Sequence, residues 1–281
     1  MNKYYSKLGL INWCLKLLLE SILIVVGVLA IGFLFAPLGL GGGILYVPLF
    51  HYVGGWEIDQ KLIIVSLLLS AITSYGSGLE HRKKSFIDDE LTGIALWGAI
   101  PGAMIGVFFV MVTGTEFKSI FKILSVVVVG FVIYKMVGKM NNTASDVEEI
   151  RDVQMGKMTS LSAFGGFLSS VMAIGAGMIY VPAMKFFGNL ETRKSIGSSL
   201  NIMMVVVPFA IVAHFMLLND YQISQLLDEA ILLIILIVAN FSGSKMGAIL
   251  GFKLFDEHVL MKVFIAVLSI TWVNYVIDLI I

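Results

Sequence analysis

The chain has 281 residues, of which 58% are hydrophobic and only 14% charged, and its formal net charge at pH 7 is zero. Average soluble domains are about 25% charged, so this composition excludes an ordinary soluble domain and predicts a protein embedded in a lipid bilayer. The balanced charge argues against nucleic acid as a partner, and one cysteine with four scattered histidines leads us to expect no disulfide, no metal and no cofactor.

Long windows without Asp, Glu, Lys or Arg predict the membrane spans, because a spanning helix needs roughly 20 apolar residues. The clearest windows are residues 21–56, 62–79, 91–115, 158–184 and 195–219, and three windows with charged residues at or near their ends are 119–137, 230–252 and 259–277. We expect an all-α polytopic membrane protein with about eight transmembrane segments, inserted as a multi-pass protein in the cell membrane. Residues 1–16 lack a signal-peptide cleavage site and are interpreted as an N-terminal tail.

Two segments of the chain, Gly39–Pro48 (GLGGGILYVP) and Ala173–Pro182 (AIGAGMIYVP), are nearly the same and lie 134 positions apart. Residues downstream of the two copies also match, at a spacing of 133 for Ser66-Leu67 and His81 against Ser199-Leu200 and His214, and Gly102-xxx-Gly106 is echoed by Gly243-xxx-Gly247. The chain is therefore predicted to contain two homologous four-segment halves, residues 17–137 and 158–281, joined by a polar linker, 138–157. Glycine-broken segments at equivalent places in two halves are typical of secondary transporters.

The glycine run has a physical reason to break its helix. As one helix, residues 21–56 would be about 54 Å long, against a hydrocarbon core of about 30 Å. Glycines between Pro37 and Pro48 supply the break, and a helix that restarts at Ile44 would direct free N–H groups at an anion. We expect Gly41, Gly42, Gly43, Gly175 and Gly177 to line the substrate site. The alternative is close helix packing at small residues, whereas a nucleotide-binding loop lacks its third glycine and its preceding strand.

Polar residues inside the spans are few, and their cost in lipid makes them candidates for function. Ser66, Ser70, Thr73 and Ser77 share one helical face, and Ser198, Ser199 and Asn201 stand at the start of the sixth segment. As neutral donors they would bind an oxyanion without a fixed cation, with Asn201 and Ser199 as the preferred pair. The alternative is that these hydroxyls hold the helices together.

Three ionisable residues add to this set. Lys245 is the one basic residue well inside an apolar span; it either faces the cavity as a counter-charge or extends its amine to the membrane surface. His81 and His214 occupy equivalent positions at span ends, where each either carries a coupling proton or anchors the interface. No Walker A motif is present, so we expect transport to run on a proton, sodium or substrate gradient.

Taken together, the GLGGG-xxx-VP segment, the later Ser-Leu pair, the run His81–Lys84, the Pro101–Gly106 segment and the degenerate second copy resemble the TauE/SafE sulfite exporter family. The resemblance covers residues 19–280. It implies an eight-segment carrier of sulfite, sulfonates or other small sulfur-containing or carboxylate anions, with the substrate held near the broken helices. Val65 stands where a threonine often precedes the first Ser-Leu, and the second glycine run is thinned to Gly175-Ala176-Gly177.

The Lys and Arg distribution favours inverted halves. If all eight segments cross, and Lys245 is left aside, the basic residues divide 10 to 8 between the two faces. If the broken first and fifth segments enter and leave on the same side, the division is 12 to 6, as the excess of basic residues on the cytoplasmic face requires.

The predicted function is a secondary transporter of small anions that works by alternating access between the two halves. An anion-selective channel and a membrane-embedded enzyme are the alternatives. An enzyme is disfavoured because no His, Asp, Glu or Cys cluster occurs within the spans. The sequence leaves open whether the protein forms a homo-oligomer.

Overall fold

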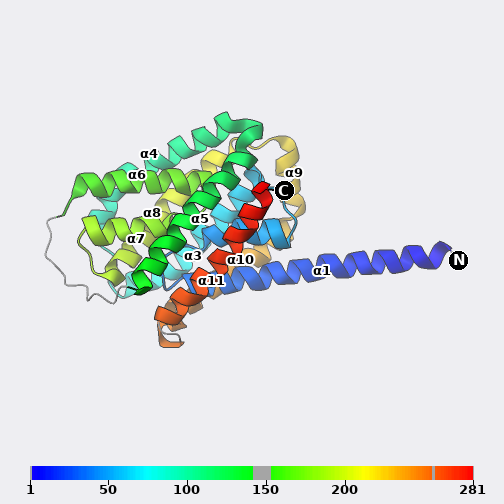
Figure 1. Ribbon diagram of the computed structural model, residues 1–281, viewed down its shortest axis with the longest axis horizontal. Helices are drawn as coiled ribbons and strands as arrows, with labels where there is room; N and C mark the ends of the chain where they lie inside the picture. Colours follow the sequence, from blue (N-terminus) through cyan, green and yellow to red (C-terminus); the bar gives the residue numbers. More distant parts are fainter. Residues whose placement is uncertain (1, 142–152, 255–256, 281) are drawn as a thin grey trace.

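The computed structural model describes residues 2–141, 153–254 and 257–280, and within these ranges the chain consists of helices joined by short non-helical segments, with no strand (Figure 1). The first half contains α1 (Asn2–Phe35), α2 (Gly43–Pro48), η1 (Leu49–Val53), α3 (Gln60–Lys83), α4 (Asp89–Thr113), η2 (Gly114–Glu116) and α5 (Phe117–Asn141). The second half contains α6 (Met155–Met172), α7 (Gly177–Pro182), η3 (Ala183–Phe187), α8 (Thr192–Phe215), α9 (Asp220–Asp228), α10 (Ala230–Leu254) and α11 (Glu257–Ile280).

Six of the described helices are long and apolar enough to cross a membrane: α1, α3, α4, α5, α8 and α10. Each predicted window nevertheless coincides with helix. α6 falls outside the six because serines, glycines and Lys157 lower its hydropathy, and the described apolar stretch of α11, Ile265–Ile280, is shorter. The prediction of a multi-pass helical membrane protein is confirmed, whereas α9 was not predicted. Most of the predicted linker, residues 142–152, lies outside the described residues.

Both glycine-rich segments break their helices, as predicted. α1 ends at Phe35 and α2 begins at Gly43; α6 ends at Met172 and α7 begins at Gly177. The backbone is left-handed at three equivalent positions of each break, with φ of 67°, 71° and 72° at Gly39, Gly41 and Gly42, and of 55°, 69° and 55° at Ala173, Gly175 and Ala176. The first break uses glycine at every such position, where no Cβ opposes the conformation. The second break imposes it on two alanines.

The two halves interlock. α1 packs on α10 and α6 packs on α4, so each helix before a break lies against a helix of the other half, and α5 lies beside α11 (Figure 1). A Cβ added at Gly102 would collide with the backbone of Ala163 in α6, and one at Gly243 with the backbone of Leu29 in α1. The repeated Gly-xxx-Gly pairs therefore serve close helix packing.

Helices α3 and α8 form the centre of the bundle and contact each other. The buried share of the span is 78% for α3 and 56% for α8, against 17% for α5. Large apolar side chains cover the outer surface, including Trp97 on α4 and Ile231 on α10, which are 83% and 77% exposed. This arrangement is that of a bundle surrounded by lipid, with its polar residues gathered around α3 and α8.

Candidate substrate site

The two helix breaks touch at the buried centre of the molecule, and this contact between residues 39–43 and 173–177 is called the crossing below. A Cβ at Gly43 would collide with the carbonyl of Ala173, and one at Gly177 with the carbonyl of Gly39. The hydroxyl of Ser66 on α3 lies 3.4 Å from the Gly43 carbonyl and 3.2 Å from that of Ala173, so it can donate to either break. Glycine is required at positions 43 and 177 because only a residue without a side chain lets the two backbones approach this closely.

A methionine from α8 lies between the breaks. Added Cβ atoms at Gly41 and Gly175 would both meet the terminal methyl of Met203, and the one at Gly175 would lie 3.7 Å from the Ser70 hydroxyl. Met203 is the repeat counterpart of Ser70, at the spacing of 133. A thioether side chain is flexible and fills irregular space, and Met203 fills the space between the two breaks. Met203 was not predicted from the sequence.

In the first half, a closed polar cluster holds the broken helix. The Tyr46 hydroxyl lies 2.8 Å from Thr73 Oγ1 and donates to Asn240 Oδ1, also at 2.8 Å. Asn240 Nδ2 donates to the Leu69 carbonyl at 2.6 Å. All three side chains are fully buried. The cluster ties α2 to α3 and α10; only Thr73 was predicted, because Tyr46 and Asn240 stand 194 positions apart.

The equivalent region of the second half lacks this cluster. Tyr180 is the counterpart of Tyr46, but Val206 and Ala99 stand where the first half has Thr73 and Asn240. In the described part of the chain, the buried side-chain atoms without a hydrogen-bond partner are the hydroxyls of Ser162, Ser169, Ser170, Tyr180 and Ser199 and the Nδ1 of His214. More than 90% of buried polar groups are normally paired. All six of these atoms belong to α6, α7 and α8.

The predicted polar face of α3 is buried, but its hydroxyl groups already donate hydrogen bonds to backbone carbonyls. Ser70 and Ser74 donate to the carbonyls of Ser66 and Ser70 at 2.9 and 2.8 Å, and Thr73 donates to that of Leu69 at 3.0 Å. Ser77 donates to the Ala36 carbonyl at the end of α1, at 2.8 Å. The bonds of Ser70, Thr73 and Ser74 stay within α3, whereas that of Ser77 joins α3 to the end of α1, as the packing alternative proposed for these hydroxyls.

Ser199 and Asn201, the preferred pair of anion-binding residues, lie on different faces of α8. Ser199 is buried on the helical face of Ile196 and Met203, which lie against Gly39 and Gly41 of the first break. The Asn201 side chain instead lies 3.4 Å from Asp89 and 3.5 Å from Arg82, at the start of α4 and the end of α3. Successive helical residues turn by about 100°, so residues two apart point in nearly opposite directions. Ser198 accepts the Asp88 backbone N–H at 2.9 Å and supports the α3–α4 loop. Only Ser199 remains near the crossing.

Lys245 does not face the crossing. Its side chain is exposed on the outer side of α10, where it interacts electrostatically with Glu80 on α3. This corrects its placement in the substrate site and agrees with the alternative that the amine extends to the membrane surface.

The two histidines are buried in the last turns of α3 and α8 rather than placed at an interface. His81 Nδ1 donates to the Ser77 carbonyl at 3.0 Å, and His214 Nε2 donates to the Ser170 carbonyl at 3.0 Å. Ser170 and Ala36 are repeat counterparts, so in the second half the histidine binds the carbonyl that a serine binds in the first half.

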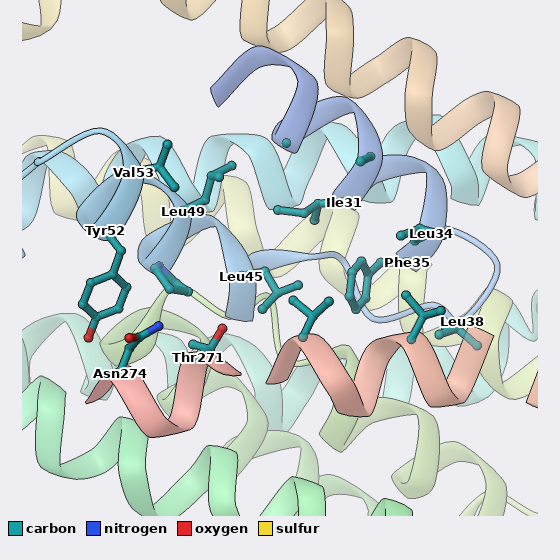
Figure 2. Close-up of a pocket in the computed structure, with 15 residues that line it drawn as sticks. Ile31, Leu34, Phe35, Leu38, Leu45, Leu49, Tyr52, Val53, Thr271 and Asn274 are labelled. Carbon is teal, nitrogen blue, oxygen red and sulfur yellow. The ribbon is translucent and has the colours of Figure 1, made fainter. Parts of the chain in front are cut away.

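An apolar groove of about 330 Å³ lies between α1, the α2–η1 segment and α11 (Figure 2). Leu45, Leu49 and Ile31 line it on one side, and the polar side chains Tyr52, Thr271 and Asn274 lie toward one end. An anion would lose its water there without gaining enough donors. The groove therefore suits a hydrocarbon chain and is not the anion site.

Two adjoining cavities, of about 490 and 590 Å³, lie at the start of α3 beside α9 and share the polar residues Asp59, Asn219 and Gln222. Asn219 caps α9 reciprocally with Gln222, which explains why this short helix forms. Lys61 lines the larger cavity, and burial raises the pKa of the nearby Glu229 carboxyl although Lys61 opposes the shift. Both cavities lie close to the end of α8, at one end of the bundle.

A charged cluster joins the end of the first broken helix to α5 and α11. Asp278 Oδ2 lies 2.8 Å from Lys122 Nζ and 3.4 Å from both His51 Nε2 and the Tyr52 hydroxyl. Within the described residues, no group of three or more His, Cys, Asp or Glu side chains is arranged to hold a metal. The cluster adds a further attachment of the first broken helix to its surroundings.

Comparison with known proteins identifies a matching family and similar membrane proteins. The family model "Sulfite exporter TauE/SafE" matches residues 23–275. A "Probable membrane transporter protein" of Xylella fastidiosa strain Temecula1 is 27% identical over 241 residues, covering 83% of this chain and 86% of that protein. "Probable membrane transporter protein YunE" of Bacillus subtilis strain 168 is 25% identical over 258 residues, covering 85% and 91%. No solved structure matches the chain. These names describe membrane transporters rather than enzymes.

Proposed function

The chain belongs to the TauE/SafE sulfite exporter family and is a multi-pass membrane transporter, and we propose that it carries a small anion across the cell membrane by alternating access. One observation carries this proposal: two glycine breaks, one from each half, meet at the buried centre between α3 and α8. Irregular backbone is tolerated at membrane depth only inside protein or along a cavity. In transporters built from repeats, such breaks form the substrate site.

The proposed architecture is a pair of inverted repeats with about eight membrane segments. The α1–α10 and α6–α4 contacts are equivalent under exchange of the halves, which supports a two-fold relation. Ala36, after α1, is bonded to Ser77 near the end of α3, whereas η1 ends at Val53, shortly before α3 begins. A first segment that enters and leaves on one side agrees with this path and with the 12 to 6 division of basic residues.

The proposed substrates are sulfite, sulfonates or other sulfur-containing or short organic anions. Among the described side chains, no Lys or Arg is buried, so the centre of the bundle offers hydroxyl and backbone donors rather than a fixed cation. Neutral donors bind an oxyanion weakly enough for release. The candidate site residues from the sequence that lie at the crossing are Gly41, Gly43, Ser66, Ser70, Gly175, Gly177 and Ser199.

Coupling to a proton is part of the proposal, with sodium as the alternative ion. His214 is the better-placed histidine, because its Nδ1 is buried without a partner among the described residues and Leu217, which lines the 490 Å³ cavity, follows it closely. An imidazole can take up and release a proton at its ring nitrogens. An anion channel is the competing function, and it differs in showing neither saturation nor counter-exchange.

The first experiment is a thermal-shift screen of the detergent-purified protein against sulfite, sulfate, thiosulfate, sulfoacetate, taurine, lactate and chloride at matched ionic strength. A ligand at 100 times its dissociation constant adds about 2.7 kcal/mol to the free energy of unfolding. We expect selective stabilisation by one anion class, followed by saturable counter-exchange of that anion in proteoliposomes. Absence of both stabilisation and flux for every anion would refute the proposal, and flux without saturation would support a channel.

A further inference from the structure

Two serines with unpaired hydroxyls lie on one face of α6, and a tyrosine of α7 with an unpaired hydroxyl packs against that face. Ser162, Gly165 and Ser169 are three and four residues apart and therefore share a helical face. A Cβ at Gly165 would lie 2.7 Å from Cε1 and 3.1 Å from Cδ1 of Tyr180. The tyrosine ring thus rests on this face between the two serines. All three hydroxyls are fully buried and, within the described residues, have no hydrogen-bond partner.

The first half has no such group. At the spacing of 134, the counterparts of Ser162, Gly165 and Ser169 on α1 are Val28, Ile31 and Phe35, all buried and apolar. The counterpart of Tyr180 is retained as Tyr46, but its hydroxyl is bonded to Thr73 and Asn240. The same position in the fold is therefore packed with hydrocarbon in one half and carries small residues and free hydroxyls in the other.

Free buried hydroxyls of this kind suit one class of ligand. Leaving a hydroxyl unpaired inside protein costs free energy, which a bound acceptor recovers. Serine and tyrosine both donate O–H bonds, and bonds to an ionised acceptor are roughly twice as strong as neutral ones. The serines have not bonded to carbonyls of their own helix, as those of α3 have, so their protons remain available.

We propose that Ser162, Ser169 and Tyr180 form the subsite that binds a small oxyanion, so that the anion lies on the α6–α7 side of the crossing and not between α1 and α2. This inference rests on the proposed function of anion transport and deepens it by assigning the substrate to one half. Tyr180 belongs to the broken helix α7, so binding of the anion and movement of the break are coupled directly.

The test compares two tyrosines that differ only in their partners. Sulfite, sulfoacetate and lactate serve as probes, and the dissociation constant and the unfolding temperature are measured for wild type, Tyr180→Phe and Tyr46→Phe. We expect Tyr180→Phe to weaken binding about tenfold or more, since one charge-assisted bond is lost, while its unfolding temperature is unchanged or raised. We expect Tyr46→Phe to lower the unfolding temperature and to change affinity by less than about twofold. Ser169→Ala, a second variant, should weaken binding in the same way as Tyr180→Phe.

The outcomes separate the two proposals. If wild type binds a probe and Tyr180→Phe and Ser169→Ala bind it equally well, the subsite is refuted and anion transport is not. If Tyr46→Phe and Tyr180→Phe lose affinity equally, the anion lies between the halves, and the assignment to one half is refuted. If wild type neither binds nor transports any of the seven anions of the thermal-shift screen, the proposed function is refuted, and the subsite with it.

Discussion

The two broken helices have the same backbone but different surroundings. Tyr46 on α2 is bonded to α3 and α10, and the end of its helix is held by the Asp278 cluster. Tyr180 on α7 has no hydrogen-bond partner in the described part of the chain. Both halves keep the break, but its surroundings differ. The first break is held by hydrogen bonds to neighbouring helices, whereas the second keeps hydroxyl groups that have no partner in the described residues.

The two breaks also differ in backbone strain. Left-handed conformation costs a residue with a Cβ roughly 1–2 kcal/mol, and the second break places Ala173 and Ala176 there, where the first places Gly39 and Gly42. Strain of this kind persists when packing enforces it and is common at sites that switch. The second break is therefore the less stable of the two and the better placed to move.

The largest effect on stability is expected at Gly43 and Gly177, where both halves have a glycine packed against backbone. Gly43→Leu and Gly177→Leu should each abolish recovery of folded protein or cost about 3 kcal/mol or more, because the new side chain meets backbone that cannot yield. Size-exclusion chromatography and thermal unfolding measure this. Gly93→Ala is the control, since nothing lies within 4 Å of its added Cβ. If leucine is tolerated at only one of the two positions, the two breaks do not pack against each other equivalently, and this prediction is wrong.

A smaller effect should appear in the first half alone. Asn240→Ala leaves the Tyr46 hydroxyl and the Leu69 carbonyl short of a partner, which should cost about 2 kcal/mol of stability. Anion affinity should be unchanged. Asn201→Ala, which removes only long contacts to Asp89 and Arg82, should alter stability by less than about 0.5 kcal/mol. A large loss of affinity in either variant would contradict the assignment of the anion to α6 and α7.

The smallest change tests whether the halves can be made more alike. Val206→Thr restores to α8 the residue type that α3 has at Thr73, and it should give the Tyr180 hydroxyl an acceptor. Hydrogen bonds between membrane helices contribute about 0.6 kcal/mol on average, so a small gain in unfolding temperature is expected, together with weaker anion binding. An unchanged unfolding temperature would mean that Tyr180 does not reach position 206.

Much of the fold followed from local properties of the chain. Charge-free windows predicted the helices, glycines between Pro37 and Pro48 predicted the first break to within one residue of the start of α2, and the repeated segment predicted the second break. The site was predicted less well. Gly43, Gly177 and Ser199 lie at the crossing, but Asn201 and Lys245 point away from it, because the direction of a side chain depends on which neighbours its helix meets.

The sequence by itself determined the membrane class, the duplication and the breaks, because hydropathy and glycine act on the residues where they occur. Only the tertiary structure decided which hydroxyls are paired. Tyr46 and Tyr180 stand in matching sequence segments, yet their environments are set by Thr73 and Asn240 in one half and by Val206 and Ala99 in the other. Those residues come from distant helices, and hydrogen bonding acts only over about 3 Å, so packing had to be known before the two halves could be told apart.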